Sequence, residues 1–221
     1  FYERWEDPKI TSDRPDSDFF HALPKYQKNN TPCAAAWLKV AGGRGRTEHR
    51  GRSKSRSEEA QAIARELKRL IDVDDRLTFG VIAFYADQVD AIKEALRTEG
   101  LCEATDSGGI RVAAAYQQTM GFNNKPTERL RVGTVDSFQG KEFDVVLLSI
   151  TRSNNLPDVT DADRRRKYGH LLLNNRLCVA MSRQQRLLIA VGDLEFIQLA
   201  EALPPLRAFA ELCGGDHGVI L

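Results

Sequence analysis

The sequence predicts an α/β fold in which a parallel sheet carries helices on both faces. Strand-like and helix-like segments alternate along the chain, which favours a parallel sheet with crossover helices. Residues 143–150, FDVVLLSI, are too continuously apolar for a half-exposed strand, so they indicate a sheet that is covered on both sides. The 221 residues, 42% hydrophobic and 29% charged, are typical of a globular protein of one domain or two small ones, and argue against disorder, collagen or a coiled coil.

The first 56 residues are expected to form an irregular segment with one edge strand and a basic loop. Prolines interrupt this segment repeatedly, at Pro8, Pro15, Pro24 and Pro32. Residues 34–40 form a candidate strand. Residues 44–56, RGRTEHRGRSKSR, hold six Lys and Arg, and two interpretations stay open: a solvated loop, or a loop that faces phosphates.

From residue 57 onward, hydrophobic periodicity and glycine or proline breaks define the elements in order. Ser57 is expected to cap the first helix, and Gly100 to end the second. We expect helices at 57–71, 86–99, 174–182 and 194–203, strands at 78–84, 130–134, 143–150 and 186–191, and polar loops or insertions at 103–128 and 153–170.

Composition and spacing exclude several classes of protein. No apolar run approaches the roughly 18 residues of a membrane span. The four cysteines lie far apart, which argues against a metal site or disulfides and for an intracellular protein, and Cys178 and Cys213 are expected to be buried thiols. A net charge of +1 gives no simple argument for nucleic-acid binding. The chain starts at Phe1, so we expect a fragment of a longer protein.

An α/β sheet invites a search for a phosphate loop, and the sequence lacks one. Gly140 and Lys141 would need a glycine at position 135, where Val135 stands. Asp193 follows an apolar strand, as a magnesium carboxylate would, but without a phosphate loop it reads as a strand-end or N-cap residue. Ligands of such sheets bind at the carboxyl ends of strands, so we expect chemistry just after residues 84, 134, 150 and 191.

Two segments remain, and together they resemble the helicases of superfamily 1. Residues 132–142 read VGTVDSFQGKE and lead into the apolar strand, which resembles motif V. Residues 176–186 read RLCVAMSRQQR, with Arg176 and Arg183 expected near one face of a helix, and resemble motif VI. Residues 84–88, FYADQ, are similar to a PYxxQ segment of the group, and residues 169–171, GHL, to its GFL. The group includes the nonsense-mediated-decay helicase, senataxin and the replication helicase-nucleases.

The resemblance implies that residues 57–221 are the second of two RecA-like domains, with ATP in the cleft between them. By this resemblance Arg183 is the arginine that reaches the γ-phosphate, and an upstream RecA-like domain supplies the phosphate loop and the Mg²⁺ ligands. Nucleotide contacts are expected from Gly140, Lys141, Glu142 and Arg176. Contacts to single-stranded DNA or RNA are expected from Thr134, Asp136, Ser137, Arg152 and Asn154.

Two hypotheses of different classes follow. The first is an ATP-driven helicase or translocase, of which this chain is one motor domain and is inactive alone. The second is a non-catalytic module with a RecA-like fold that binds nucleic acid or protein. Phosphate-loop and magnesium-carboxylate motifs upstream in a longer chain would favour the first.

Overall fold

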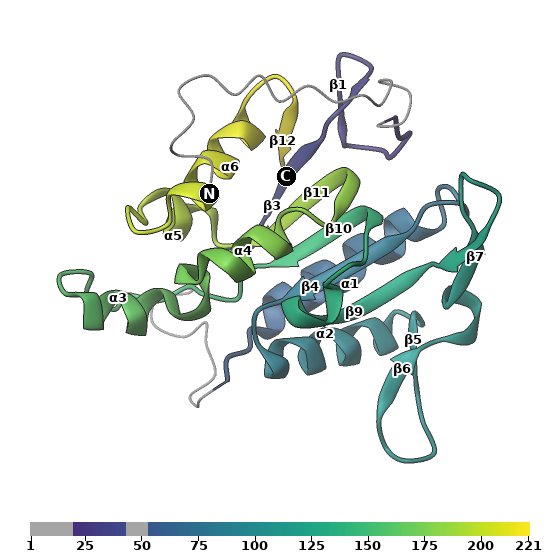
Figure 1. Cartoon of the computed structure of the whole chain (residues 1–221), viewed down its shortest axis with the longest axis horizontal. Coiled ribbons are helices and arrows are strands. Elements are labelled where there is room, and N and C mark those ends of the chain that lie inside the picture. Colours follow the sequence, from purple (N-terminus) through teal and green to yellow (C-terminus); the bar gives the residue numbers. More distant parts are fainter. Residues whose placement is uncertain (1–19, 43–52) are drawn as a thin grey trace.

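The computed structural model describes residues 20–42 and 53–221. Within these ranges, the centre of the molecule is a six-stranded sheet in the order β12-β3-β11-β10-β4-β9, and every neighbouring pair is parallel (Figure 1). Its strands are β3 (Ala35–Lys39), β4 (Phe79–Ala83), β9 (Leu130–Thr134), β10 (Phe143–Ser149), β11 (Gln184–Gly192) and β12 (Gly218–Ile220). The predicted α/β fold with a parallel sheet is confirmed.

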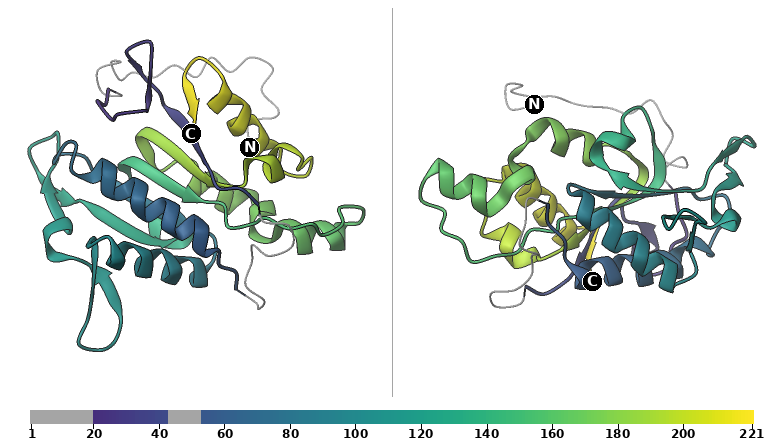
Figure 2. Two further views of the ribbon diagram at one scale, coloured as in Figure 1. Left: turned by 180° about the vertical axis from the view of Figure 1, so that it is seen from behind. Right: turned by 90° about the horizontal axis from the view of Figure 1, so that it is seen from below.

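Helices cover both faces of this sheet, as the apolar run of β10 predicted. One face packs against α1 (Ser57–Ile71) and α2 (Ala86–Thr98), which lie in front of the sheet in the left view of Figure 2. The other face packs against α4 (Asn174–Ala180), α5 (Leu194–Gln198) and α6 (Pro204–Gly214). Alternate residues of each strand enter the two cores: Val145 and Leu147 face α1, whereas Val146 and Leu148 face the opposite layer.

The segment before residue 57 belongs to the same core as the rest of the chain. A short hairpin of β1 (Gln27–Lys28) and β2 (Thr31–Pro32) leads into β3. The expectation of an edge strand here is wrong, because β3 lies between β11 and β12. The C-terminal β12 adds outside β3 and takes the edge position. Expectations for residues 1–19 and for most of the basic run lie outside the described residues.

The two segments expected to be loops contain regular structure. Residues 103–128 form two antiparallel hairpins beside the β9 edge, and residues 153–170 include a helix (Figure 1). These elements are β5 (Cys102–Ala104), β6 (Ile110–Val112), η2 (Ala114–Tyr116), β7 (Gln118–Met120), β8 (Pro126–Glu128) and α3 (Asp161–Tyr168). Two 3-10 turns complete the fold, η3 (Val135–Phe138) and η4 (Gly169–Leu172).

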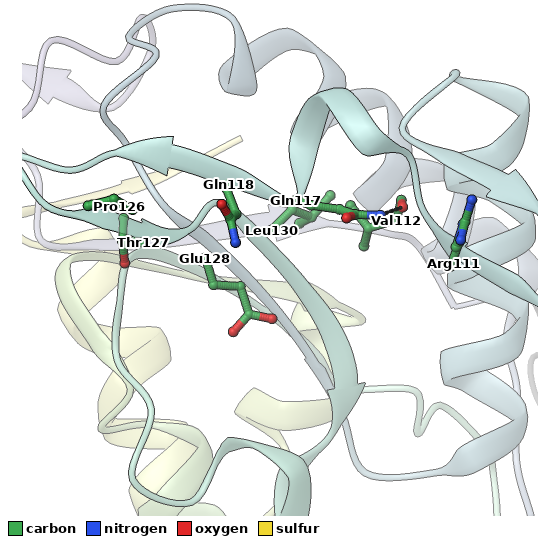
Figure 3. A pocket seen from close by; sticks show the side chains of 8 residues that line it. All are labelled: Arg111, Val112, Gln117, Gln118, Pro126, Thr127, Glu128 and Leu130. Atoms are coloured by element: carbon green, nitrogen blue, oxygen red, sulfur yellow. Dashed lines mark hydrogen bonds between the residues drawn. The ribbon is translucent and has the colours of Figure 1, made fainter.

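The hairpins enclose a hollow of about 450 Å³ next to β9. Figure 3 shows Gln118, Thr127 and Glu128 toward one end of it and Arg111 at the other. None of the residues predicted as functional lines this hollow. In the part of the chain that the structure describes, no helix is long and apolar enough to cross a membrane.

Candidate nucleotide and nucleic-acid site

The first group of predicted residues lies at the amino ends of β10 and β11. The backbone N–H of Phe143 donates to the carbonyl of Arg183 at 2.9 Å, so the segment before β10 lies against the segment before β11. The Arg183 guanidinium donates through Nη1 to the carbonyl of Lys141 at 3.4 Å. Gln185 Nε2 donates to Glu142 Oε2 at 3.1 Å. The structure therefore brings together the arginine, the lysine and the carboxylate that motifs V and VI predicted.

Arg183 is held in place without being neutralised. Its Nε donates to the carbonyl of Val179 at 3.1 Å, and its Nη2 donates to Ser182 Oγ at 2.9 Å. Among the described residues no carboxylate lies within 4.0 Å of this guanidinium, whereas Arg176 and Arg186 each pair with an aspartate. A fixed, partly exposed and uncompensated guanidinium is suited to binding an external anion.

Gly140 shapes the loop beside this group. Its φ of 71° is in the left-handed region that favours glycine, and no heavy atom lies within 4 Å of where a Cβ would stand. Gly140, Lys141 and Glu142 are all exposed. The loop thus presents open backbone and two charged side chains at this edge of the sheet.

The second group of predicted residues lies at the other end of the strands, where β4 and β9 finish. Thr134 pairs in register with Ala83, and Ala83 with Ser149, the last residue of β10. This level is six residues, or about 20 Å, from the start of β10 at Phe143. Thr134 and Asp136 therefore lie far from Arg183 along the sheet. The Thr134 group thus follows strand ends, where chemistry was expected, whereas the Arg183 group lies where strands begin.

Arg176 belongs to the second group. Its Nη2 donates to Asp136 Oδ2 at 2.9 Å, which joins motif VI to motif V. Helix α4 ends at Ala180, so Arg183 lies beyond it, and the expectation that Arg176 and Arg183 share a helix face is wrong. Arg176 therefore lies beside the predicted nucleic-acid contact Asp136 and apart from the other predicted nucleotide contacts, Gly140, Lys141 and Glu142.

Ser137 also lies at this edge, in the turn η3. Its hydroxyl donates to the carbonyl of Thr134 at 2.7 Å, and the carbonyl of Ser137 accepts from Arg131 Nη1 at 3.2 Å. These bonds fix the turn that follows β9. The exposed side of the turn carries Asp136 and Ser137, whereas Val135 and Phe138 are buried.

Arg152 and Asn154, both predicted nucleic-acid contacts, donate hydrogen bonds to the main chain of α3. Arg152 is buried, and its Nε donates to the carbonyl of Lys167 at 2.9 Å. Asn154 Nδ2 donates to the same carbonyl at 3.0 Å. Both side chains thus bind the last turn of α3. The expectation for Arg152 is wrong, because its guanidinium is buried against the main chain.

A hollow of about 340 Å³ opens between the ends of β4 and β9 and the start of α4. Its walls include two residues that the sequence interpretation did not select, Tyr85 and His170. Their rings stack with centroids 4.6 Å apart and 7° between planes. The signal existed, because Tyr85 is the tyrosine of FYADQ and His170 the central residue of GHL. The remaining lining residues are Ser53, Phe84, Ala86, Thr134, Val135, Asp136 and Arg176.

Asp193 is an N-cap, as predicted. Its Oδ1 accepts from the backbone N–H of Phe196 at 3.1 Å, and its Oδ2 accepts from Ser153 Oγ at 2.5 Å. Across residues 20–42 and 53–221, no three His, Cys, Asp or Glu side chains converge closely enough to hold a metal ion.

The architecture is that of an α/β domain, and the two segments that resemble motifs V and VI each connect elements of its parallel sheet. The family described as an AAA domain matches residues 5–195, most of the chain, and the chain belongs to this family. The resemblance to superfamily 1 helicases is confirmed by its curated relatives.

Three of these relatives are helicases of eukaryotes. The DNA polymerase alpha-associated DNA helicase A of Saccharomyces cerevisiae is 42% identical over 84 residues, 38% of this chain and 11% of its own length. The putative helicase mov-10-B.2 of Danio rerio is 30% identical over 140 residues, 63% of this chain and 12% of its own length. The helicase required for RNAi-mediated heterochromatin assembly 1 of Schizosaccharomyces pombe is 37% identical over 81 residues, 37% of this chain and 7% of its own length.

The chain thus spans about a tenth of the length of these relatives. Among solved structures, the C-terminal domain of a possible DNA helicase from Lactobacillus plantarum WCFS1 aligns with 85% of this chain and 91% of its own, with 14% identity and a TM-score of 0.41.

Proposed function

We propose that this chain is the second motor domain of an ATP-dependent helicase or translocase that acts on single-stranded nucleic acid. The observation that carries the proposal is Arg183, a guanidinium fixed by three hydrogen bonds, with no carboxylate partner among the described residues. The positive charge of Arg183 has no paired negative charge in the part of the chain that the structure describes. The triphosphate of a bound nucleotide would supply one. Lys141 and Glu142 lie beside it, as the motifs of the family require.

In this proposal the chain contributes electrostatic stabilisation to phosphoryl transfer. The nucleophile is water, and the ligands of the metal ion belong to another domain. Water attacks the γ-phosphorus of ATP, and the bond from that phosphorus to the β,γ-bridging oxygen breaks, which releases ADP and phosphate. Arg183 stabilises the negative charge on the transferred group, which is the part an arginine finger has in such reactions. Glu142, oriented by Gln185, is placed to accept a hydrogen bond from a ribose hydroxyl. Mg²⁺ and the phosphate loop come from an upstream RecA-like domain.

Coupling between nucleotide and strand would run through the segment from Thr134 to Glu142. This segment starts at the carboxyl end of β9 and returns to the amino end of β10, and its turn η3 packs against α4. Two contacts join this segment to the motif VI segment: Arg176 with Asp136 at the carboxyl ends of the strands, and Arg183 with Lys141 at their amino ends. A movement of one of these contact pairs on nucleotide binding would therefore move the other pair.

The test is the substitution Arg183→Ala in a polypeptide that joins this chain to the phosphate-loop domain. We expect kcat of the strand-stimulated ATPase to fall by about 10³–10⁵, the usual effect of removing an arginine finger. Arg183→Lys should recover little, because a point charge does not replace a planar fork. Arg97→Ala is the matched control, since Arg97 is exposed on α2 and pairs only locally with Glu94. A loss below tenfold for Arg183→Ala would show that another residue has this function.

A further inference from the structure

The hollow between β4, β9 and α4 has an apolar wall and a charged rim. Phe84, Ala86 and Val135 line the wall together with the His170 ring, and Arg176 and Asp136 form the rim. We propose that this hollow receives one base of the single strand and that the His170 ring is its stacking surface. This inference rests on the proposed function and adds to it a site that reads the base rather than the backbone.

His170 is held flat and fixed before any ligand arrives. Its Nδ1 lies 2.9 Å from the carbonyl oxygen of Phe84 and 3.5 Å from Arg176 Nη1, and the shorter contact favours the tautomer in which Nδ1 donates to the carbonyl. Its backbone N–H donates to the Tyr85 hydroxyl at 3.1 Å, and the Tyr85 ring stacks on the His170 ring. A ring fixed by one hydrogen bond of its own, one of its backbone and one stacked neighbour loses little conformational entropy when a base stacks on it.

The approach of Tyr85 to His170 requires a glycine at position 169. Gly169 has a φ of 53°, and a Cβ there would overlap the Tyr85 hydroxyl oxygen. The chain therefore has a glycine, the residue without a side chain, where the aromatic pair closes. FYADQ and GHL, two separate segments of the sequence, build a single aromatic stack.

Size and charge favour a base over a phosphate group. The volume of about 340 Å³ is near the lower end of the about 300–1,000 Å³ of small-molecule pockets, which suits one heterocycle. The Asp136 carboxylate at the rim repels phosphate, whereas the Arg176–Asp136 pair offers both donors and an acceptor to a base edge. Thr134, which lines the hollow, and Ser137, on the turn η3 next to it, carry hydroxyls where the backbone of the same nucleic-acid strand would pass.

The experiment compares two labelled 12-nucleotide strands that differ only in their bases. One is oligothymidine, and the other carries abasic sugar-phosphates at its central positions, so that both have the same charge. Binding to the 221-residue protein at low salt is followed by fluorescence anisotropy. For the wild-type protein we expect the abasic strand to bind about fivefold to hundredfold more weakly, as is usual for loss of a base stacked on an aromatic side chain.

Three variants locate the effect. His170→Ala should weaken binding of the intact strand and abolish the difference between the two strands. His170→Phe keeps a flat ring and should retain the difference, which separates stacking from a general loss of structure. His217→Ala is the matched control, because His217 is an exposed histidine near β12, and it should behave as the wild type.

Each other outcome is decisive. If the wild-type protein binds both strands equally, the base site is wrong and the proposed strand-binding function is left intact. If it binds neither strand, the nucleic-acid part of the proposed function is wrong as well. If free ATP displaces the intact strand and His170→Ala weakens ATP to the same extent, the occupant is a nucleotide and the inference is overturned.

Discussion

A buried carboxyl group gives the most sensitive test at the scale of single residues. Glu59, at the start of α1, is fully buried against the end of β10. Its Oε1 accepts from Ser149 Oγ at 2.5 Å and from the backbone N–H of Thr151 at 2.8 Å, and its Oε2 lies 3.4 Å from Arg56 Nη1. Burial raises the pKa of Glu59 from 4.5 to about 7, although the hydrogen bonds and Arg56 act in the opposite direction.

A raised carboxyl pKa makes the folded protein hold a proton that the unfolded chain releases. The associated stability is therefore complete below about pH 4.5 and is lost as the pH rises through about 7. We expect the free energy of unfolding to fall by about 1–3 kcal/mol over this window. Glu59→Gln keeps the shape and removes the titration. The difference between the two proteins, from urea unfolding at several pH values, should change across this window; a constant difference would show that Glu59 stays ionised.

The positions of the predicted site residues show what the sequence motifs can and cannot predict about the site. The resemblance to motifs V and VI implied one nucleotide site for Arg183, Lys141 and Glu142, and the structure brings their segments together because these precede the adjacent strands β10 and β11. The same spacing could not separate Arg176 from Arg183, since this depends on α4 ending at Ala180. Cys178, expected to be buried, is exposed, whereas Cys213 is buried as predicted. A seven-residue helix carries too few positions for its buried face to be identified from periodicity.

At the scale of elements, Gln88 joins two helices to the sheet. It lies on α2, is fully buried, and is the glutamine of FYADQ. Its Oε1 accepts from the backbone N–H of Arg56 at 2.6 Å, and its Nε2 donates to Ser149 Oγ at 3.0 Å. One side chain therefore ties the start of α1 and the end of β10 to α2.

Removing this side chain leaves buried polar groups without a partner. We expect Gln88→Ala to lower the free energy of unfolding by about 1–3 kcal/mol, the cost of leaving such groups unsatisfied. Gln61→Ala on the exposed side of α1 is the control and should stay within about 0.5 kcal/mol of the wild type. Urea unfolding followed by circular dichroism measures both. Equal stabilities for the two variants would show that the Gln88 bonds contribute nothing net.

The elements that sequence reasoning missed have physical causes. Helix α3 buries only Tyr168, so it has no apolar stripe, and its one clear signal is the capping box formed by Thr160 and Asp163. The hairpins of residues 103–128 are built from three-residue strands whose side chains, except for Cys102, are exposed or half-exposed, and which are too short for a clear alternation. The Ser57 cap was wrong by one residue, because Arg56 holds the N-cap position and makes no side-chain cap bond.

At the scale of the whole molecule, the sheet holds the two groups of predicted site residues at opposite ends of its strands. The Arg183 group lies where β10 and β11 begin, and the Thr134 group lies where β4 and β9 end. The parallel register places these levels about 20 Å apart. The fold class and both motif groups were predictable from the sequence, since each is local or periodic. Their separation was not, because it follows from the direction of β9 and β10 in the assembled sheet.

This division predicts that the chain alone does not turn over ATP. In the proposed function Arg183 only stabilises charge, so activation of water and binding of Mg²⁺ fall to other residues, and no phosphate loop is present in the sequence. With ATP, Mg²⁺ and single-stranded DNA or RNA, phosphate release by the purified 221-residue protein should equal the protein-free background. The same chain joined to a phosphate-loop domain should hydrolyse ATP, and its Arg183→Ala variant should not. Robust turnover by the isolated chain would overturn the division of labour, whereas strand binding without turnover even in the joined polypeptide would favour the non-catalytic module.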